Sequence, residues 1–361
     1  VISGNYDITM TANDDTGGFA MQPGGNNTFH NLTATGTQLA LNGSSHTVIP
    51  GNLTVNAVEG KLSWIWLNSN NMFADNSVIA LNNDGSQEAM IFNTGVVDII
   101  GTITGDGSLE MQSAAAHFRL SGGPATFSGR VDGYTDSMIE TIGGSWTFAG
   151  RNADIGNGFT SYYVNGGKFI ANAADTSLSM SPFSMSDGVL AGTDLIGRLS
   201  AYGGTVAPGN SPGCLYPAGD VAFTADASYL NIEINGTTAC SGYDVLNASG
   251  DVALNNAVLN LSILNGYSST YGNKFTVVQG NSVGGTFRDL SDGDVITSGD
   301  MQFRINYTQN SVTLTDITPE KTSLVSTLAE TGGPVAAFLA AATALILVGI
   351  YTYRRRRTLH N

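Results

Sequence analysis

Short apolar segments of three to five residues recur along this chain, separated by clusters of Gly, Asn and Asp. Apolar and polar residues alternate within each segment, which is typical of strands that bury one side. No helical pattern of useful length occurs before residue 318. The segments that predict strands include residues 47–49, 53–55, 77–81, 96–100, 118–120, 146–148, 162–164 and 168–170.

The spacing of these segments predicts how they stack. Many recur at roughly 20 to 25 residues, the length in which a coil of several short strands closes on itself. Stacked coils bury their inward residues against the next coil. We therefore expect an all-β fold, a parallel β-helix, with its coils in residues 1–200. A β-sandwich is the alternative, but it would join sequential strands by hairpin turns.

Composition supports strands and limits the partners. Glycine accounts for 46 of 361 residues and charged residues for only 12%, a composition that suits short strands and tight turns. All 29 acidic residues but only 10 of the 14 basic residues precede residue 335, so this part carries 10 − 29 = −19. This charge disfavours nucleic acid and anionic lipid as partners.

The C-terminal residues predict a membrane segment. Residues 335–353 are 19 uncharged residues, about 28 Å of helix, which is close to the thickness of a bilayer core. Four arginines follow, and a basic flank favours the cytoplasmic side. We expect a single transmembrane helix over 334–353 and a cytoplasmic basic tail over 354–361. An ordinary membrane anchor is one interpretation of this pattern.

The order of pentapeptide, apolar span and basic tail resembles a Gram-positive sortase sorting signal. The pentapeptide is Leu328, Ala329, Glu330, Thr331 and Gly332. It differs from the family pattern Leu-Pro-x-Thr-Gly at Ala329, a difference that bears on the sortase class. The resemblance implies that a sortase cleaves after Thr331 and joins it to peptidoglycan, with residues 317–333 as a linker.

A second resemblance covers about residues 95–316. Residues 101–109 and 120–129 are similar to an autotransporter-associated β-strand repeat. Residues 203–213, Gly-Gly-Thr-Val-Ala-Pro-Gly-Asn-Ser-Pro-Gly, closely resemble the closing motif of that family. The resemblance implies a right-handed parallel β-helix with a terminal segment over 201–316. Residues 270–316 would supply paired strands that cap the last coil, since an uncovered coil end would pair with other chains.

The two cysteines, Cys214 and Cys240, are predicted to form a disulfide. They lie 26 residues apart, close to one coil, so their Cα atoms should lie within about 7 Å. Two cysteines and four scattered histidines give little support for a zinc site.

Catalytic motifs and cofactor fingerprints are lacking in the sequence, and we expect neither enzyme activity nor a cofactor. We interpret His117 and Arg119 as surface residues of one strand. An enzyme on this scaffold would bring carboxylates, or Arg and Lys, together in a groove. The candidate carboxylates lie beside or close to Gly or Ser, so we interpret them as turn residues. For the last pair a calcium site is the alternative. The pairs are Asp14 with Asp15, Asp132 with Asp136, and Asp292 with Asp294.

Trp64 and Trp66 alternate with Ile65 and therefore point to the same side of a strand. Directed outward, they would form a platform on which sugars stack. Directed inward, they would be stacked core residues, which is the interpretation that the sequence favours.

These observations lead to one hypothesis and two alternatives. We expect a cell-surface, wall-anchored protein that acts as an adhesin or stalk, with a glycan or the surface of a host or neighbouring cell as partner. The alternatives are a polysaccharide lyase or hydrolase and a purely structural surface spacer. Residues 1–4 show no export signal, so we expect a mature form or a fragment.

Overall fold

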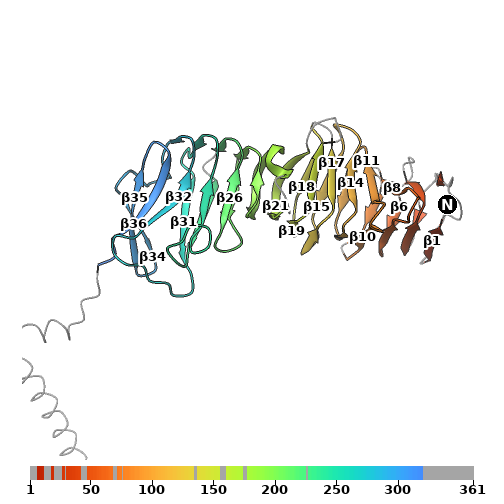
Figure 1. Ribbon diagram of the computed structural model, residues 1–361, viewed down its shortest axis with the longest axis horizontal. Coiled ribbons are helices and arrows are strands. Elements are labelled where there is room, and N and C mark those ends of the chain that lie inside the picture. The colour runs from red at the N-terminus through yellow and green to blue at the C-terminus, as the bar shows by residue number, and fades with distance from the viewer. Residues whose placement is uncertain are drawn as a thin grey trace, which may run out of the picture. The chain divides into compact units, whose positions relative to one another are not determined.

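The protein is a parallel β-solenoid in which strands from successive coils pair in register (Figure 1). The computed structural model describes residues 6–11, 18–19, 27–28, 30–41, 47–67, 71–74, 76–133, 136–154, 160–173, 177–224 and 227–319. Within these ranges the only helical segment is a four-residue 3-10 turn, η1 (Ser177–Met180). The prediction of an all-β parallel solenoid is confirmed.

Most of the described coils contribute one strand to each of three faces. The first face is the ladder of β1 (Asp7–Thr11), β4 (Asn31–Thr35), β7 (Leu53–Asn56), β10 (Val78–Asn82) and β13 (Thr102–Gly105). A ladder in later coils holds β16 (Ala125–Phe127), β19 (Ser145–Phe148), β25 (Gly204–Pro208), β28 (Ser228–Ile234) and β31 (Val258–Ile263).

The second face contains the residues considered below as a functional site. Its seven-stranded ladder is β2 (Gly18–Phe19), β5 (Gln38–Leu41), β8 (Ser63–Leu67), β11 (Ala89–Asn93), β14 (Ser108–Met111), β17 (Arg130–Gly133) and β20 (Arg151–Asp154). A further ladder holds β23 (Leu195–Ile196), β26 (Cys214–Pro217), β29 (Val245–Asn247) and β32 (Lys274–Gln279).

The third face runs through most coils. Its early strands are β3 (Asn27–Thr28), β6 (Thr47–Ile49), β9 (Asn71–Phe73), β12 (Val96–Ile99), β15 (His117–Leu120) and β18 (Met138–Thr141). Its later strands are β24 (Leu199–Ala201), β27 (Val221–Phe223), β30 (Val252–Ala253) and β33 (Val283–Gly284).

Two long strands, β21 (Ser161–Ala171) and β22 (Phe183–Gly192), each belong to two faces. The first half of β21 pairs with β18 and the second half with β19. The sequence predicted two separate strands here, 162–164 and 168–170, and the structure joins them into one. Gly166 and Gly167, both at positive φ, let the backbone bend at the corner without a terminating turn.

The core is built from stacks of equivalent inward residues. On the second face, Leu39, Ile65, Ile91, Leu109 and Val131 are successive register partners, each at most 2% exposed. On the first face, Leu32 pairs with Leu53, Leu53 with Ile79 and Ile79 with Ile103, steps of 21, 26 and 24 residues. These steps agree with the coil length expected from the sequence.

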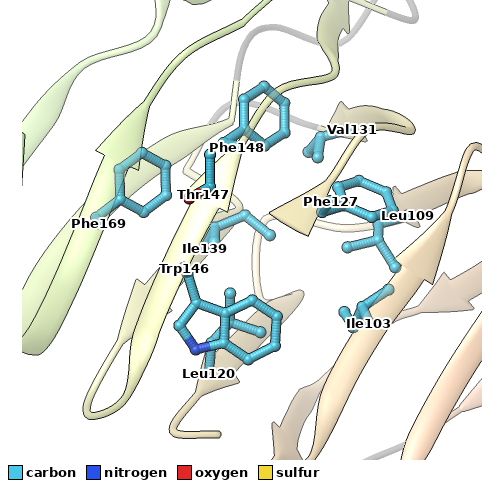
Figure 2. Close-up of a pocket in the computed structure, with 10 residues that line it drawn as sticks. All are labelled: Ile103, Leu109, Leu120, Phe127, Val131, Ile139, Trp146, Thr147, Phe148 and Phe169. Carbon is cyan, nitrogen blue, oxygen red and sulfur yellow. The ribbon is translucent and has the colours of Figure 1, made fainter. Parts of the chain in front are cut away.

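A small apolar cavity of about 20 Å³ lies among the inward side chains of the middle coils (Figure 2). Trp146 and Phe148 of β19 line it together with Leu109 and Val131 of the second face. The Trp146 indole N–H has no hydrogen-bond partner among the described residues. A water molecule needs two to four polar partners, so this cavity is best explained as a packing defect.

The last coil is covered by an antiparallel sheet of β34 (Val295–Ser298), β35 (Met301–Tyr307) and β36 (Ser311–Asp316) (Figure 1, blue). Strand β36 pairs with β32 on one side and with β35 on the other. The strands that the sequence assigned to a cap, within 274–278 and 302–307, are therefore both partners of β36.

The sorting motif, the predicted span over 334–353 and the basic tail all lie outside the described residues. Within the described ranges, no helix is long and apolar enough to cross a membrane.

Candidate functional site

Trp64 and Trp66 lie on the outer surface of the second face. Their neighbours Ser63, Ile65 and Leu67 are fully buried, while both tryptophans keep partial exposure. The interpretation that placed the two rings in the core is wrong. The sequence shows their common direction but not which side of the strand the core occupies.

A third ring joins the two tryptophans. Phe92 of β11 is the register partner of Trp66, and its ring centroid lies 5.4 Å from that of Trp64 and 6.2 Å from that of Trp66. The two tryptophan centroids are 6.4 Å apart. These separations and the tilted ring planes are typical of favourable aromatic pairs. Trp64, Trp66 and Phe92 are named the aromatic cluster below.

Charged side chains occupy the same outward-facing positions on the next two strands, where Glu110 and Asp132 are buried. Glu110 of β14 is the register partner of Phe92, and Asp132 of β17 is the partner of Glu110. Parallel strands lie about 4.8 Å apart, so the charged residues follow directly after the aromatic cluster. Arg130 of β17 and Glu88, just before β11, complete a group of four that is named the charged cluster.

Arg130 holds this cluster together. Its Nη2 atom lies 2.8 Å from Glu88 Oε2, 2.8 Å from Asp132 Oδ2 and 3.6 Å from Glu110 Oε1. The Ser108 hydroxyl also donates to Glu88 Oε2, at 2.7 Å. One guanidinium thus faces three carboxyl groups, which leaves the cluster short of positive charge.

Burial and mutual repulsion change the proton affinity of two of these carboxyl groups. The Asp132 side chain has no exposed surface, and its burial raises its pKa to about 7, with Arg130 opposing the shift and Glu110 and Glu88 adding to it. Burial likewise raises the pKa of Glu110. Oδ1 of Asp132 and Nε of Arg130 are buried without a hydrogen-bond partner among the described residues.

An open cleft with a volume of about 300 Å³ adjoins the charged cluster. Its size is at the lower end of the range for small-molecule sites. Asn83 shapes one wall, because its side chain donates to the Asp106 carbonyl and accepts from the Ala89 N–H. The residues that line the cleft are Asn83, Glu88, Asp106, Ser128, Gly129 and Arg130.

The structure places the two carboxylates of the candidate pair Asp132 and Asp136 in different settings. Asp136 lies in a turn at positive φ, but Asp132 is a buried residue of β17, so its interpretation as a turn residue is wrong. Sequence reasoning also missed Glu88, Glu110 and Arg130. The 22-residue step from Glu110 to Asp132 was an available signal, because it equals about one coil.

The remaining carboxylate candidates have structural partners where they are described. Asp292 accepts a hydrogen bond from the Tyr307 N–H, and Asp294 accepts one from the Ser291 N–H, within the cap. The interpretation of this pair as turn residues is confirmed. Asp14 and Asp15 lie outside the described residues.

His117 and Arg119 lie on the outer surface of the third face, each beside a carboxylate from an adjacent coil. His117 Nε2 is 3.0 Å from Glu140 Oε2, and Arg119 forms two hydrogen bonds with Asp98 at 2.5 and 2.6 Å. Burial lowers the pKa of His117, and Glu140 opposes this shift. Pairing between coils gives both residues a structural role, in agreement with their interpretation as surface residues.

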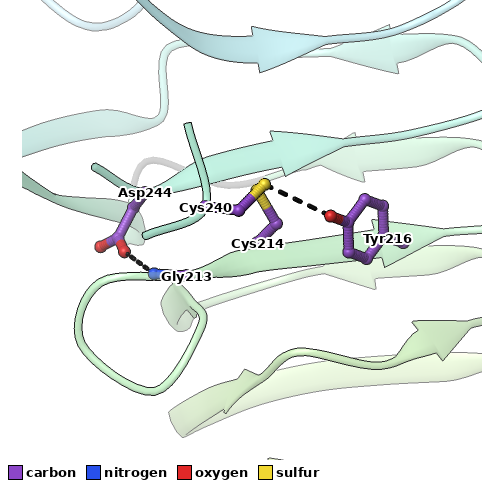
Figure 3. Close-up of a disulfide and its surroundings, with 5 residues drawn as sticks. All are labelled: Gly213, Cys214, Tyr216, Cys240 and Asp244. Carbon is purple, nitrogen blue, oxygen red and sulfur yellow. Dashed lines mark hydrogen bonds between the residues drawn. A yellow bond between two sulfur atoms is a disulfide. The ribbon is translucent and has the colours of Figure 1, made fainter. Parts of the chain in front are cut away.

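Cys214 and Cys240 form a disulfide with Cα atoms 4.8 Å apart, in the later coils (Figure 3). The Tyr216 hydroxyl lies 3.3 Å from Cys240 Sγ. Nearby, the buried Asp244 accepts hydrogen bonds from the N–H groups of Gly213, at 2.6 Å, and Glu233, at 2.9 Å. Its burial raises its pKa to about 7, although both hydrogen bonds oppose the shift.

Among the residues that the structure describes, no group of three or more His, Cys, Asp and Glu side chains is arranged to hold a metal ion. The aromatic and charged clusters offer aromatic rings, carboxyl groups and the Arg130 guanidinium.

Comparison of the chain with protein-family models finds no match, and comparison with curated proteins finds no matching relative. The two resemblances drawn from sequence motifs accordingly remain predictions.

Proposed function

We propose that this protein is a cell-surface, right-handed parallel β-helix that binds a glycan without turning it over, as an adhesin does. The observation that carries the proposal is the aromatic cluster on β8 and β11, on the same outward side of the second face as the charged cluster that adjoins the cleft. Its three rings are half-buried and gathered into one apolar patch, and a clustered apolar patch marks an interaction site more often than single apolar residues do.

The chemistry of this surface suits sugars. A pyranose ring has a C–H face that packs on an aromatic ring and hydroxyl groups that need donors and acceptors. The aromatic cluster supplies rings on which the C–H face can pack. At the cleft, hydrogen-bond donors and acceptors for the hydroxyl groups come from Arg130, Glu88, Asp106 and Asn83. A few polar groups beside an apolar surface are the usual composition of a specific ligand site.

A glycan-binding screen with the purified full chain tests the proposal. Trp66→Ala should weaken binding of any glycan found by about tenfold or more, as expected for an anchor residue. Tyr202→Ala removes an aromatic ring that is 57% exposed and is not part of the aromatic cluster, and it should leave binding unchanged. Equal affinity of wild type and Trp66→Ala would contradict the proposed site.

We also propose that the protein reaches the wall through the motif Leu328–Gly332, with a sortase and peptidoglycan as partners and a membrane helix before processing. The motif, the apolar span and the four arginines support this proposal. Thr331→Ala should move the protein from the wall fraction to the membrane fraction, because transfer passes through the Thr331 carbonyl. Unchanged wall attachment would refute the sorting signal.

A polysaccharide hydrolase is the second candidate, because the charged cluster is the carboxylate and arginine group that an enzyme on this scaffold needs. Asp132, with its pKa near 7, would be protonated often enough to act as an acid. Its complete burial, however, keeps it from touching a substrate. Cleavage of a polysaccharide by wild type but not by Asp132→Asn would favour the enzyme. A protein with neither binding nor turnover would be a spacer.

A further inference from the structure

We infer that the glycan recognised at the second face carries free ammonium groups, so that its class is an amino-sugar oligomer with unacetylated amines. This inference rests on the proposed glycan-binding function and names the ligand class for that same site. It follows from the charges around the cleft, the unused hydrogen-bond acceptors there and the neighbouring aromatic rings.

The charges that surround the cleft are mostly negative. Glu88 and Asp106 line it, and Glu110 and Asp132 lie against Arg130, the one cation in its lining. With all four carboxyl groups ionised, the group carries −4 + 1 = −3. If Glu110 and Asp132 both hold protons, as their raised pKa values favour, Glu88 and Asp106 still outweigh Arg130 by one charge.

Arg130 is already occupied by protein carboxylates. Its Nη2 atom lies 2.8 Å from both Glu88 and Asp132, so its positive charge is already offset by protein carboxylates and attracts an anionic ligand only weakly. An acidic glycan would therefore meet uncompensated carboxylates. Electrostatic repulsion of this kind is an effective means of rejecting a ligand class.

Unused acceptors lie where an ammonium group could reach them. Glu88 Oε2 accepts from Ser108 and Arg130, and no described residue donates to its second oxygen. The Glu88 side chain is 40% exposed. Asp106, which is exposed and also lines the cleft, accepts from the Asn83 N–H through Oδ1. An ammonium group is a donor of three hydrogen bonds and no acceptor, which complements such a set.

The aromatic cluster strengthens the same preference. Met90 links the two groups, because it is the register partner of both Trp64 and Ser108. A sugar that spans from the cleft onto Trp64 and Trp66 would place a neighbouring amine near their ring faces. Cations are attracted to the face of a tryptophan ring, whereas a hydroxyl group gains much less there.

Three β-1,4-linked hexamers provide the test, because they share the backbone and differ only at C2. They are the hexamers of glucosamine, N-acetylglucosamine and glucose, titrated calorimetrically into the full chain at a pH that keeps the amines protonated. The glucosamine hexamer should bind at least about tenfold more tightly than the other two. This preference should shrink as salt is added, because the cleft is open to solvent.

Glu88→Gln should reduce the preference for the glucosamine hexamer to less than about threefold. The preference is a ratio of affinities, so it reports the lost carboxylate even if binding of the neutral hexamers also changes. The matched control is Glu59→Gln, which neutralises an exposed glutamate in the turn before β8 that does not line the cleft. This variant should keep the full preference.

The outcomes separate the inference from the function on which it rests. Equal binding of all three hexamers, or an undiminished preference in Glu88→Gln, overturns the amino-sugar inference and leaves glycan binding intact. Binding only of other glycans in the wider screen does the same. Binding of no glycan at all overturns the proposed function itself.

Discussion

At the scale of single residues, the coils constrain backbone positions at their corners more strongly than composition suggests. Gly144 has a φ of +67°, and a Cβ atom there would lie 1.5 Å from the Gly122 carbonyl oxygen of the preceding coil. The glycine content therefore reflects close approach between coils as well as turn conformations. Only a residue without a side chain fits where two corners stack.

Gly144→Ala should lower the free energy of unfolding by at least about 2 kcal/mol, because the corner must shift away from its neighbour. Gly60→Ala is the control. Gly60 also has a positive φ, +74°, but nothing lies within 4 Å of its Cβ position. Gly60→Ala should lower the free energy of unfolding by only about 1 kcal/mol, which is the conformational part of the effect. Equal losses in denaturant titrations would show that close approach contributes nothing.

Asp244 predicts a dependence of stability on pH. Its pKa is raised from 3.8 to about 7 in the folded chain, so the folded state holds a proton that the unfolded state has lost between these values. The contribution of Asp244 to the free energy of unfolding is fully present below about pH 4 and is lost as pH rises to about 7. The loss is up to about 4 kcal/mol.

Asp244→Asn should remove this part of the pH dependence, since the amide does not titrate. At pH 4 the variant should be less stable than wild type, because one amide N–H would face a backbone donor. This difference should shrink as pH rises to about 7, because only wild type loses the Asp244 contribution. Asp251→Asn removes an exposed carboxylate whose pKa is lowered, and it should keep the slope. Unfolding titrations between pH 4 and 7 that give equal slopes for wild type and Asp244→Asn would contradict the assignment.

At the scale of elements, local patterns predicted the strands but not their alignment. Residues 47–49 were expected to be a strand and form β6. The residues of the charged cluster come together only because of the lengths of the coils between them. The coil is 18 residues long from Met90 to Ser108 but 22 from Ser108 to Arg130. A slip of one residue would reverse which side chains face outward. Alignment between coils of variable length is therefore what the sequence could not supply.

The cavity in the middle coils makes a prediction about packing. Val131→Ile adds one methylene group beside the cavity, and burying it there should raise the free energy of unfolding by up to about 0.8 kcal/mol. Val97→Ile makes the same change at a fully buried position that does not line the cavity. It should destabilise by about 1 kcal/mol or more through overpacking. The same sign for both substitutions in denaturant titrations would argue against a usable cavity.

At the scale of the whole molecule, the solenoid has an end that must be closed. Strands inside the parallel ladders pair with the coils on both sides, so the last coil would present unpaired backbone groups without a cover. The antiparallel cap supplies the missing partner through β36, and Phe275 of β32 packs against Phe303 of β35 with ring centroids 5.8 Å apart. The cap thus satisfies the backbone and buries the final layer of core.

Deleting residues 291–317 should make the chain associate more strongly than the intact chain, because an uncovered strand edge is a template for pairing with another copy. Light scattering after size-exclusion chromatography would show mass increasing with protein concentration. In the intact chain, Thr276 of β32 pairs with Thr313 of the cap. In the shortened chain, Thr276→Lys would place a charge on the uncovered side of β32. It should reduce association if strand pairing is the cause. If the lysine leaves association unchanged, the cause would instead be the exposed ring of Phe275. If the shortened chain stays monomeric at high concentration, the cap is not needed to prevent pairing.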